Sequence, residues 1–144
     1  MKAKAYLQKI RTTDAKINAY IEELAQLEAL ATKTTSVLGG DRVQSSGSQQ
    51  KMADAVAKII ELKEKINNEI DKLIDMKEEA RKLIFEACES DCVTLLHKRY
   101  FNGYDWEEIA VDMKYTYKWV SGGLHRKALS QVQKALDGKG KNET

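Results

Sequence analysis

Two long segments repeat apolar residues at intervals of three and four, and no proline interrupts either of them. In the first, residues 2–36, Ile10, Ile17 and Leu24 are spaced by seven, which is typical of a coiled-coil seam. The second segment covers about residues 49–89, where Lys63 and Lys77 also fall on the seam. Its apolar seam positions are Met52, Val56, Ile59, Ile66, Ile70, Leu73, Ala80, Ile84 and Ala87. The chain is therefore expected to be all-α.

A single amphipathic helix over residues 49–89 would be about 60 Å long and would leave its apolar stripe without a partner. The intervening segment 37–48 is rich in Gly and Ser, which predicts a loop. We therefore predict a long antiparallel helical hairpin, coiled-coil-like, over residues 1–89 with its loop near 37–48. Because the first helix is shorter, part of the second needs another partner. A second copy of the chain would serve, so we expect a homo-oligomer, with a dimer favoured.

Composition narrows the class of protein further. No apolar run approaches the roughly 20 residues that cross a bilayer, and no apolar signal core follows the basic N-terminus. Two cysteines in 144 residues do not make a disulfide framework. We expect a soluble, cytoplasmic protein with no membrane partner.

The C-terminal segment, residues 90–136, has a different texture, with most of the aromatic residues of the chain. Asp105 followed three residues later by Glu108 is a helix-capping pattern and predicts a helix that ends at Met113. Thr116 is a suitable cap for a second helix, which we expect to extend to about Leu136. The remaining residues, 137–144, are expected to form a flexible tail.

Two helices joined by so short a turn predict a compact helix-turn-helix module. Its small core is expected from apolar residues at helical spacing. These are Ile109 and Met113 on the first helix, Val120 and Leu124 on the second, and Tyr115 between them. The charge supports this interpretation modestly, because residues 93–144 carry 9 Lys and Arg against 6 Asp and Glu.

The sequence LHKRYFNGYDWEEIA at residues 96–110 and LHRKAL at 124–129 resemble region 4 of bacterial sigma factors. That region is the helix-turn-helix that reads the −35 promoter element. The whole chain also resembles a family of small phage and prophage proteins of Gram-positive bacteria, through RVQSSG at 42–47 and AVAKII at 55–60. The resemblance implies a phage-encoded transcriptional regulator in the cytoplasm of a bacterial host cell. Its implied partners are double-stranded DNA and RNA polymerase.

The resemblance also implies which residues face DNA. Those facing bases would be Thr116, Lys118, Trp119, Ser121, Gly122 and His125. Basic side chains that hold phosphates would be Lys98, Arg99, Arg126 and Lys127. The sequence departs from the sigma pattern at residues 121–123, where Ser-Gly-Gly replaces the Lys or Arg that usually follows the first core valine of the recognition helix.

Two alternatives remain open at this stage. Small terminase subunits, which package phage DNA as rings, also join a helix-turn-helix to long helices. The Ser-Gly-Gly run at 121–123 fits instead a protein-binding module that has lost DNA affinity.

Catalysis is not expected. The sequence holds no phosphate-binding, dinucleotide-binding, zinc-protease or nucleophile-elbow motif. Cys88, Cys92 and His97 lack a clear fourth ligand, so neither a metal site nor a cofactor is expected.

Overall fold

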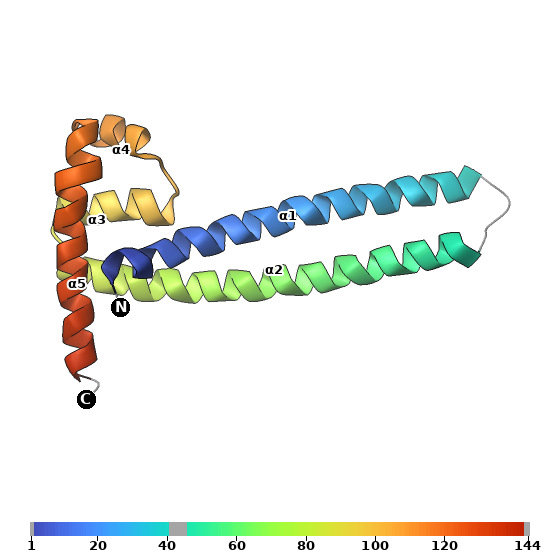
Figure 1. Cartoon of the computed structure of the whole chain (residues 1–144), viewed down its shortest axis with the longest axis horizontal. Coiled ribbons are helices and arrows are strands. Elements are labelled where there is room, and N and C mark those ends of the chain that lie inside the picture. The colour runs from blue at the N-terminus through green and yellow to red at the C-terminus, as the bar shows by residue number, and fades with distance from the viewer. Residues whose placement is uncertain (1, 41–45, 143–144) are drawn as a thin grey trace. The chain divides into compact units, whose positions relative to one another are not determined.

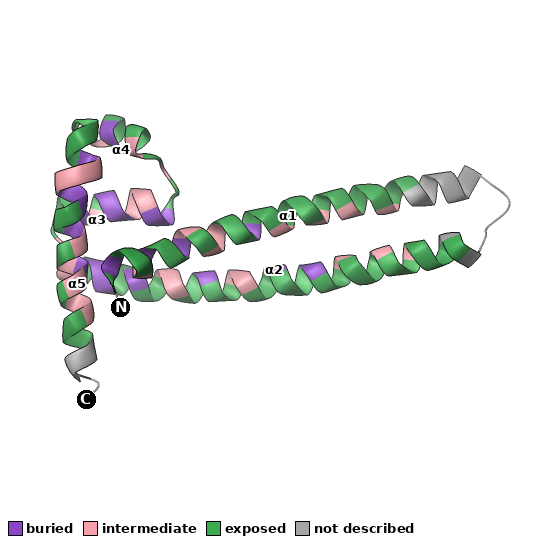
Figure 2. Ribbon diagram, viewed as in Figure 1, coloured by how far each residue is buried: buried purple, intermediate pink, exposed green. Residues whose placement is uncertain are grey.

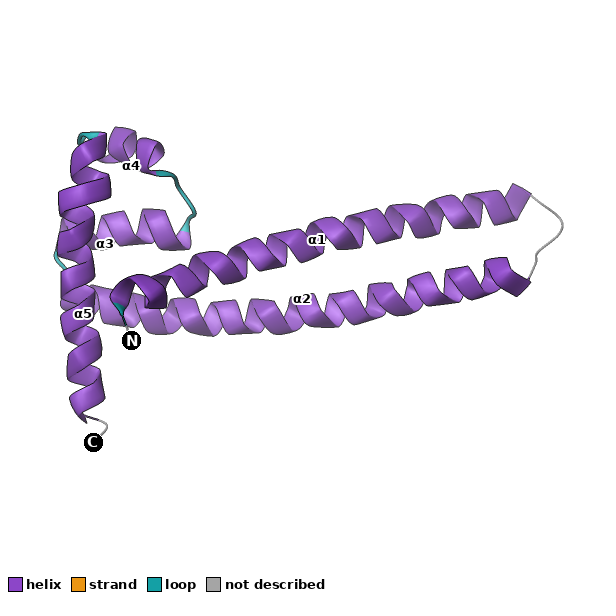
Figure 3. Cartoon of the chain, viewed as in Figure 1, coloured by secondary structure: helices purple, strands orange, loops and turns teal. Residues whose placement is uncertain are grey.

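The computed structural model describes residues 2–40 and 46–142, and all the regular structure in those residues is helical (Figures 1 and 3). The helices are α1 (Ala3–Gly40), α2 (Ser46–Ala87), α3 (Ser90–Leu96), α4 (Trp106–Met113) and α5 (His125–Asn142). Two wider π-helical stretches, His97–Phe101 and Trp119–Leu124, continue α3 and precede α5. The prediction of an all-α fold is confirmed. Within the described residues, none of the helices combines the length and the apolar character that crossing a bilayer requires.

The chain divides into two compact units, which differ from the predicted domains. One, here called the arm, is Asp14–Lys72, the middle of the long helical part. The other, here called the head, joins Met1–Thr13 to Leu73–Thr144. The head therefore recruits both the start of α1 and the second half of α2, which the sequence analysis had assigned to a separate hairpin over residues 1–89.

Within the arm, α1 and α2 run antiparallel. Lys16 Nζ lies 3.4 Å from a Glu69 carboxylate oxygen, whereas farther along α1 Glu28 lies 3.7 Å from Lys63 Nζ. The buried apolar residues of this unit are Ile17, Leu62 and Ile66.

At one position of the α2 seam, the buried residue is the neighbour of the one that the sequence predicts. Leu62 is buried, and Lys63, which was expected on the seam, has a side chain that is 57% exposed. The occupied positions then follow steps of three and four from Leu62 through Ile66 and Glu69 to Leu73. Glu69 thus takes a seam position, and Lys16 and Lys72 neutralise its carboxylate at 3.4 and 3.5 Å.

Two predicted irregular segments are largely helical. The loop expected near 37–48 is helical at both of its ends, because α1 continues to Gly40 and α2 begins at Ser46. Residues 41–45, which include most of the 42–47 motif, lie outside the described part. The tail expected at 137–144 is also wrong over most of its length, since α5 continues to Asn142.

The head has one apolar core that draws on every described helix (Figure 2). The backbone N–H of Ala3 donates to Gln133 Oε1 at 2.7 Å, which ties the first turn of α1 to α5. The core residues are Ala3, Leu7, Ile10, Leu73, Ala80, Leu83, Ile84, Cys92, Leu95, Leu96, Tyr100, Phe101, Ile109, Ala110, Val120, Leu124, Ala128 and Val132. This core holds the C-terminal helices, where the candidate site lies.

Candidate nucleic-acid interface

Helix α4 has defined ends at both termini. The Asp105 carboxylate accepts a hydrogen bond from the backbone N–H of Glu108 at 2.8 Å, so the predicted N-cap is confirmed. At the other end Lys114 takes left-handed backbone angles, with φ 60° and ψ 40°. This conformation reverses the chain and lets the Tyr115 N–H reach the Ala110 carbonyl at 3.1 Å. The turn is therefore short and fixed by backbone geometry.

The second helix begins where the sequence predicts. Thr116 Oγ1 accepts a hydrogen bond from the backbone N–H of Trp119 at 3.2 Å, as an N-cap does. Helical residues then run without interruption from Tyr117, through the π-helical stretch, into α5. A side-chain cap satisfies one of the N–H groups that every helix leaves open at its start.

The two helices share a small buried core. Ile109 and Ala110 of α4 are buried, as are Val120 and Leu124 of the π-helical stretch. Tyr115 was expected in this core, but its ring is 39% exposed and its hydroxyl donates to Asp91 at 2.7 Å. Tyr115 therefore braces the turn against the start of α3 instead of filling the core.

The first turns of the second helix are open to solvent. Thr116, Lys118 and Trp119 are exposed, and Ser121 and Gly122 are half-buried. The Ser121 hydroxyl is engaged, because it donates to the Tyr117 carbonyl at 2.7 Å. Five of the six residues expected to face bases are thus at least partly accessible.

His125 is the exception, and its predicted contact with bases is wrong. The residue is only 8% exposed, and its Nε2 lies 2.7 Å from the Tyr100 hydroxyl oxygen. The Trp106 ring packs edge-on against the imidazole, with centroids 4.7 Å apart. Burial, and then the nearby charges of Lys4 and Arg99, lower the pKa of His125 to about 4. His125 is a neutral core residue at physiological pH.

Gly123 makes room for an aromatic ring of its own helix. A Cβ added at Gly123 would lie 2.6 Å from Cε3 of Trp119, closer than carbon atoms pack. A Cβ added at Gly122 would meet nothing within 4 Å. The two adjacent glycines are therefore not equivalent: one seats the indole and the other faces open space.

Three of the four expected phosphate ligands already have partners inside the head. Lys98 Nζ lies 3.2 Å from an Asp112 oxygen, and Lys127 Nζ lies 2.7 Å from a Glu89 oxygen. The Arg99 guanidinium stacks on the Trp106 ring at 4.4 Å.

Arg126 is the fourth of these residues, and it is exposed on α5. Arg126 also lines a hollow together with Lys2 and Lys4 from the start of the chain.

Sequence reasoning missed two features of the head. It did not place the Lys4 side chain beside α5, and it did not find the buried cluster of His125, Tyr100 and Trp106. Helical periodicity would have given one signal, because His125 follows the core residue Leu124 and precedes Ala128 by three. No signal in the sequence pairs residues 2–13 with α5.

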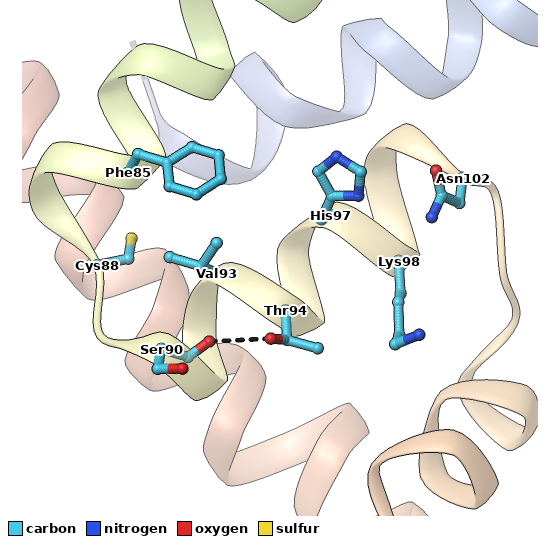
Figure 4. A pocket seen from close by; sticks show the side chains of 8 residues that line it. All are labelled: Phe85, Cys88, Ser90, Val93, Thr94, His97, Lys98 and Asn102. Carbon is cyan, nitrogen blue, oxygen red and sulfur yellow. Dashed lines mark hydrogen bonds between the residues drawn. The ribbon is translucent and has the colours of Figure 1, made fainter.

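A hollow of about 640 Å³ lies where the end of α2 meets α3 (Figure 4). Cys88 lines it, but burial and the neighbouring Cys92 raise the pKa of the Cys88 thiol to about 11. The thiol is therefore protonated at neutral pH and is a poor nucleophile. The Thr94 hydroxyl donates to the Ser90 carbonyl at 3.1 Å. In the part of the chain that the structure describes, no three His, Cys, Asp or Glu side chains are grouped to hold a metal ion.

Comparison of the chain with protein families, with curated proteins and with solved structures finds no match. Its function is therefore argued from the geometry of the head.

The two glycines give a matched pair of substitutions. Gly122→Ala should raise the stability of the protein by up to about 1 kcal/mol, because alanine is the better helix former and its Cβ meets nothing. Gly123→Ala should displace the Trp119 indole. Thermal unfolding measures the first effect, and the Trp119 indole N–H signal in NMR measures the second, with Trp106 as internal control. An unmoved Trp119 signal in Gly123→Ala would contradict the packing described here.

His125 predicts a loss of stability in mild acid. In the unfolded chain the imidazole takes up a proton near pH 6.5, whereas in the folded protein it resists protonation down to about pH 4. Its contribution is therefore complete above pH 6.5 and is lost as the pH falls toward 4. The unfolding temperature of the parent should fall between about pH 7 and pH 4.5. In His125→Gln it should fall clearly less over the same range. His97→Gln is the comparison: burial also lowers the pKa of His97, so this variant should flatten the slope less than His125→Gln does. Equal slopes in all three proteins would contradict the assignment.

Proposed function

We propose that the chain is a DNA-binding protein, a phage-encoded transcriptional regulator, and that the helix beginning at Tyr117 enters the major groove. One observation carries the proposal: this helix is capped by Thr116 and held to α4 by a buried core, while its first turns stay open to solvent. The major groove of B-DNA is about 12 Å wide, which admits one α-helix.

The chemistry of these turns suits a polyanion. Lys118 is exposed, and no Asp or Glu occurs between Lys114 and Leu136. The N-terminus of a helix also carries partial positive charge, which favours contact with phosphate. Thr116 and Lys118 together offer a hydroxyl and an ammonium group at the edge that would meet the duplex.

The regulatory part of the proposal comes from the resemblance to sigma factor region 4 at residues 96–110 and 124–129. In this proposal the arm either pairs with a second copy or contacts RNA polymerase. Ile21, Val56 and Ile60 support such a role, because these arm side chains are 47, 45 and 55% exposed. A dimer is the favoured assembly, and a ring of many subunits would instead support a DNA-packaging role.

One observation favours a second candidate, a protein-binding module. Tyr115, Tyr117 and Trp119 are all exposed around the start of the second helix. Exposed aromatic residues are enriched at the centres of protein interfaces. This candidate predicts that the parent chain does not bind DNA and that a new cation, as in Ser121→Arg, creates the affinity.

DNA binding is tested by fluorescence anisotropy with a labelled duplex of mixed sequence at low salt, about 50 mM. The parent should bind. The logarithm of its affinity should fall linearly with the logarithm of the salt concentration, because Lys and Arg side chains release counterions from the DNA phosphates when they bind. Lys118→Gln should weaken binding about tenfold, which corresponds to about 1.4 kcal/mol. The control is Lys65→Gln, which removes an exposed lysine of the arm. Absence of binding by the folded parent would reject the proposal.

A further inference from the structure

Two segments of the head carry basic residues and no acidic ones. Residues 2–13 contain Lys2, Lys4, Lys9 and Arg11 without any Asp or Glu. Residues 114–136 contain Lys114, Lys118, Arg126, Lys127 and Lys134, again without an acidic residue. The whole chain has nearly equal numbers, 24 basic and 22 acidic residues, so the local excess does not follow from composition.

The fold brings these two segments together, although they lie at opposite ends of the sequence. The Ala3 N–H donates to Gln133 Oε1 at 2.7 Å across 130 residues of chain. Ala3 and Leu7 of α1 are 3 and 0% exposed, and Ala128 of α5 is 0% exposed. The first turns of α1 are therefore fixed in the head, and their lysines have a defined place beside α5.

A hollow of about 630 Å³ marks the junction of the two segments. Its charged lining is entirely basic: Lys2 and Lys4 come from the start of the chain and Arg126 comes from α5. Ser130 adds a hydroxyl group that can donate a hydrogen bond to oxygen, whereas the Gln133 amide is engaged, since its Nε2 donates to Asp137 at 3.1 Å. Like charges held together repel one another, so an anion placed among these three side chains would be stabilised by all of them.

The distance along the helix relates this hollow to the groove-facing turns. Arg126 follows Lys118 by eight residues, which is at most about 12 Å at the α-helical rise of 1.5 Å per residue, because the π-helical stretch Trp119–Leu124 between them is wider and rises less. A helix whose first turn lies in a major groove about 12 Å wide therefore brings its third turn close to the sugar-phosphate backbone at the groove edge. Lys2 and Lys4 line the same hollow as Arg126, so their charges lie at the same end of the helix.

We propose that Lys2, Lys4 and Arg126 form a phosphate clamp that holds the backbone of the same DNA duplex whose groove receives the helix from Tyr117. The inference rests on the proposed function and adds a second, sequence-independent contact surface to it. Phosphate contacts set the register of a protein on the duplex without reading its bases. The clamp thus supplies contacts with DNA that Gly122 and Gly123, which have no side chains, do not supply.

The test is the salt dependence of duplex binding by the full-length chain, measured by fluorescence anisotropy. Removing one cation that binds a phosphate lowers the slope of log affinity against log salt by about 0.9. The double variant Lys4→Gln/Arg126→Gln should therefore lower the slope by about 2 and weaken binding roughly 10–100-fold at low salt. Lys4→Arg keeps the charge and should keep the slope.

The matched control is Lys65→Gln/Lys82→Gln, which removes two exposed lysines of α2, each paired with a glutamate one turn away. Unchanged thermal unfolding of all variants shows that the comparison concerns binding and not folding. An unchanged slope in the Lys4/Arg126 variant, with Lys118→Gln still weakened, would overturn the clamp and leave the proposed function standing. Failure of the parent to bind any duplex would overturn the proposed function itself. Equal binding of an RNA duplex, with an equal decrease in the variant, would overturn the assignment to DNA.

Discussion

The head depends on a buried apolar core to which both ends of the chain contribute residues. Ala3, Leu7 and Ile10 are nearly inaccessible, and so are Ala128 and Val132 of α5. Closing a loop of this length costs conformational entropy, which burial of apolar surface must offset at roughly 25 cal/mol per Å². Within that core α5 packs against α3 and against the π-helical stretch before it, and that stretch packs against α4. The exposed surface at Thr116 and Lys118 exists because the opposite side of the same helix is buried.

Local features of the structure could be predicted from the sequence. Asp105 and Thr116 cap helices because a short polar side chain reaches an N–H three residues ahead, and that geometry involves only neighbouring residues. The all-α fold follows from apolar spacing, which is also a local property. The long helices continue into the Gly- and Ser-rich segment near 37–48 because those residues weaken a helix without forbidding it, as a proline would.

Features that depend on the partner of a helix could not be predicted in this way. Periodicity says that one side of residues 2–13 is apolar, but it does not say that α5 covers that side. The same limit applies in part to His125: its spacing of three from Ala128 indicates the buried side of the helix, but not that Tyr100 and Trp106 enclose its ring. It also explains Lys63, because a shift of one position on α2 moves the seam to Leu62 without changing the pattern of steps.

The Ser-Gly-Gly run at 121–123 acquires a physical explanation in the structure. Gly123 leaves room for the Trp119 ring, so any side chain at that position would displace the ring from the place it occupies. The absence of donors there does not by itself indicate that DNA affinity was lost. Cations elsewhere on the head, at Lys118 and Arg126, remain exposed to meet a polyanion.

The most direct test of this account is to map the contact residue by residue. Titration of the isotope-labelled chain with a DNA duplex, followed by backbone amide NMR, locates the surface without any substitution. We expect shifts concentrated at residues 116–122 and around Lys4 and Arg126, with residues 14–72 largely unaffected. Shifts confined to the arm, or no shifts at a saturating concentration of duplex, would contradict it.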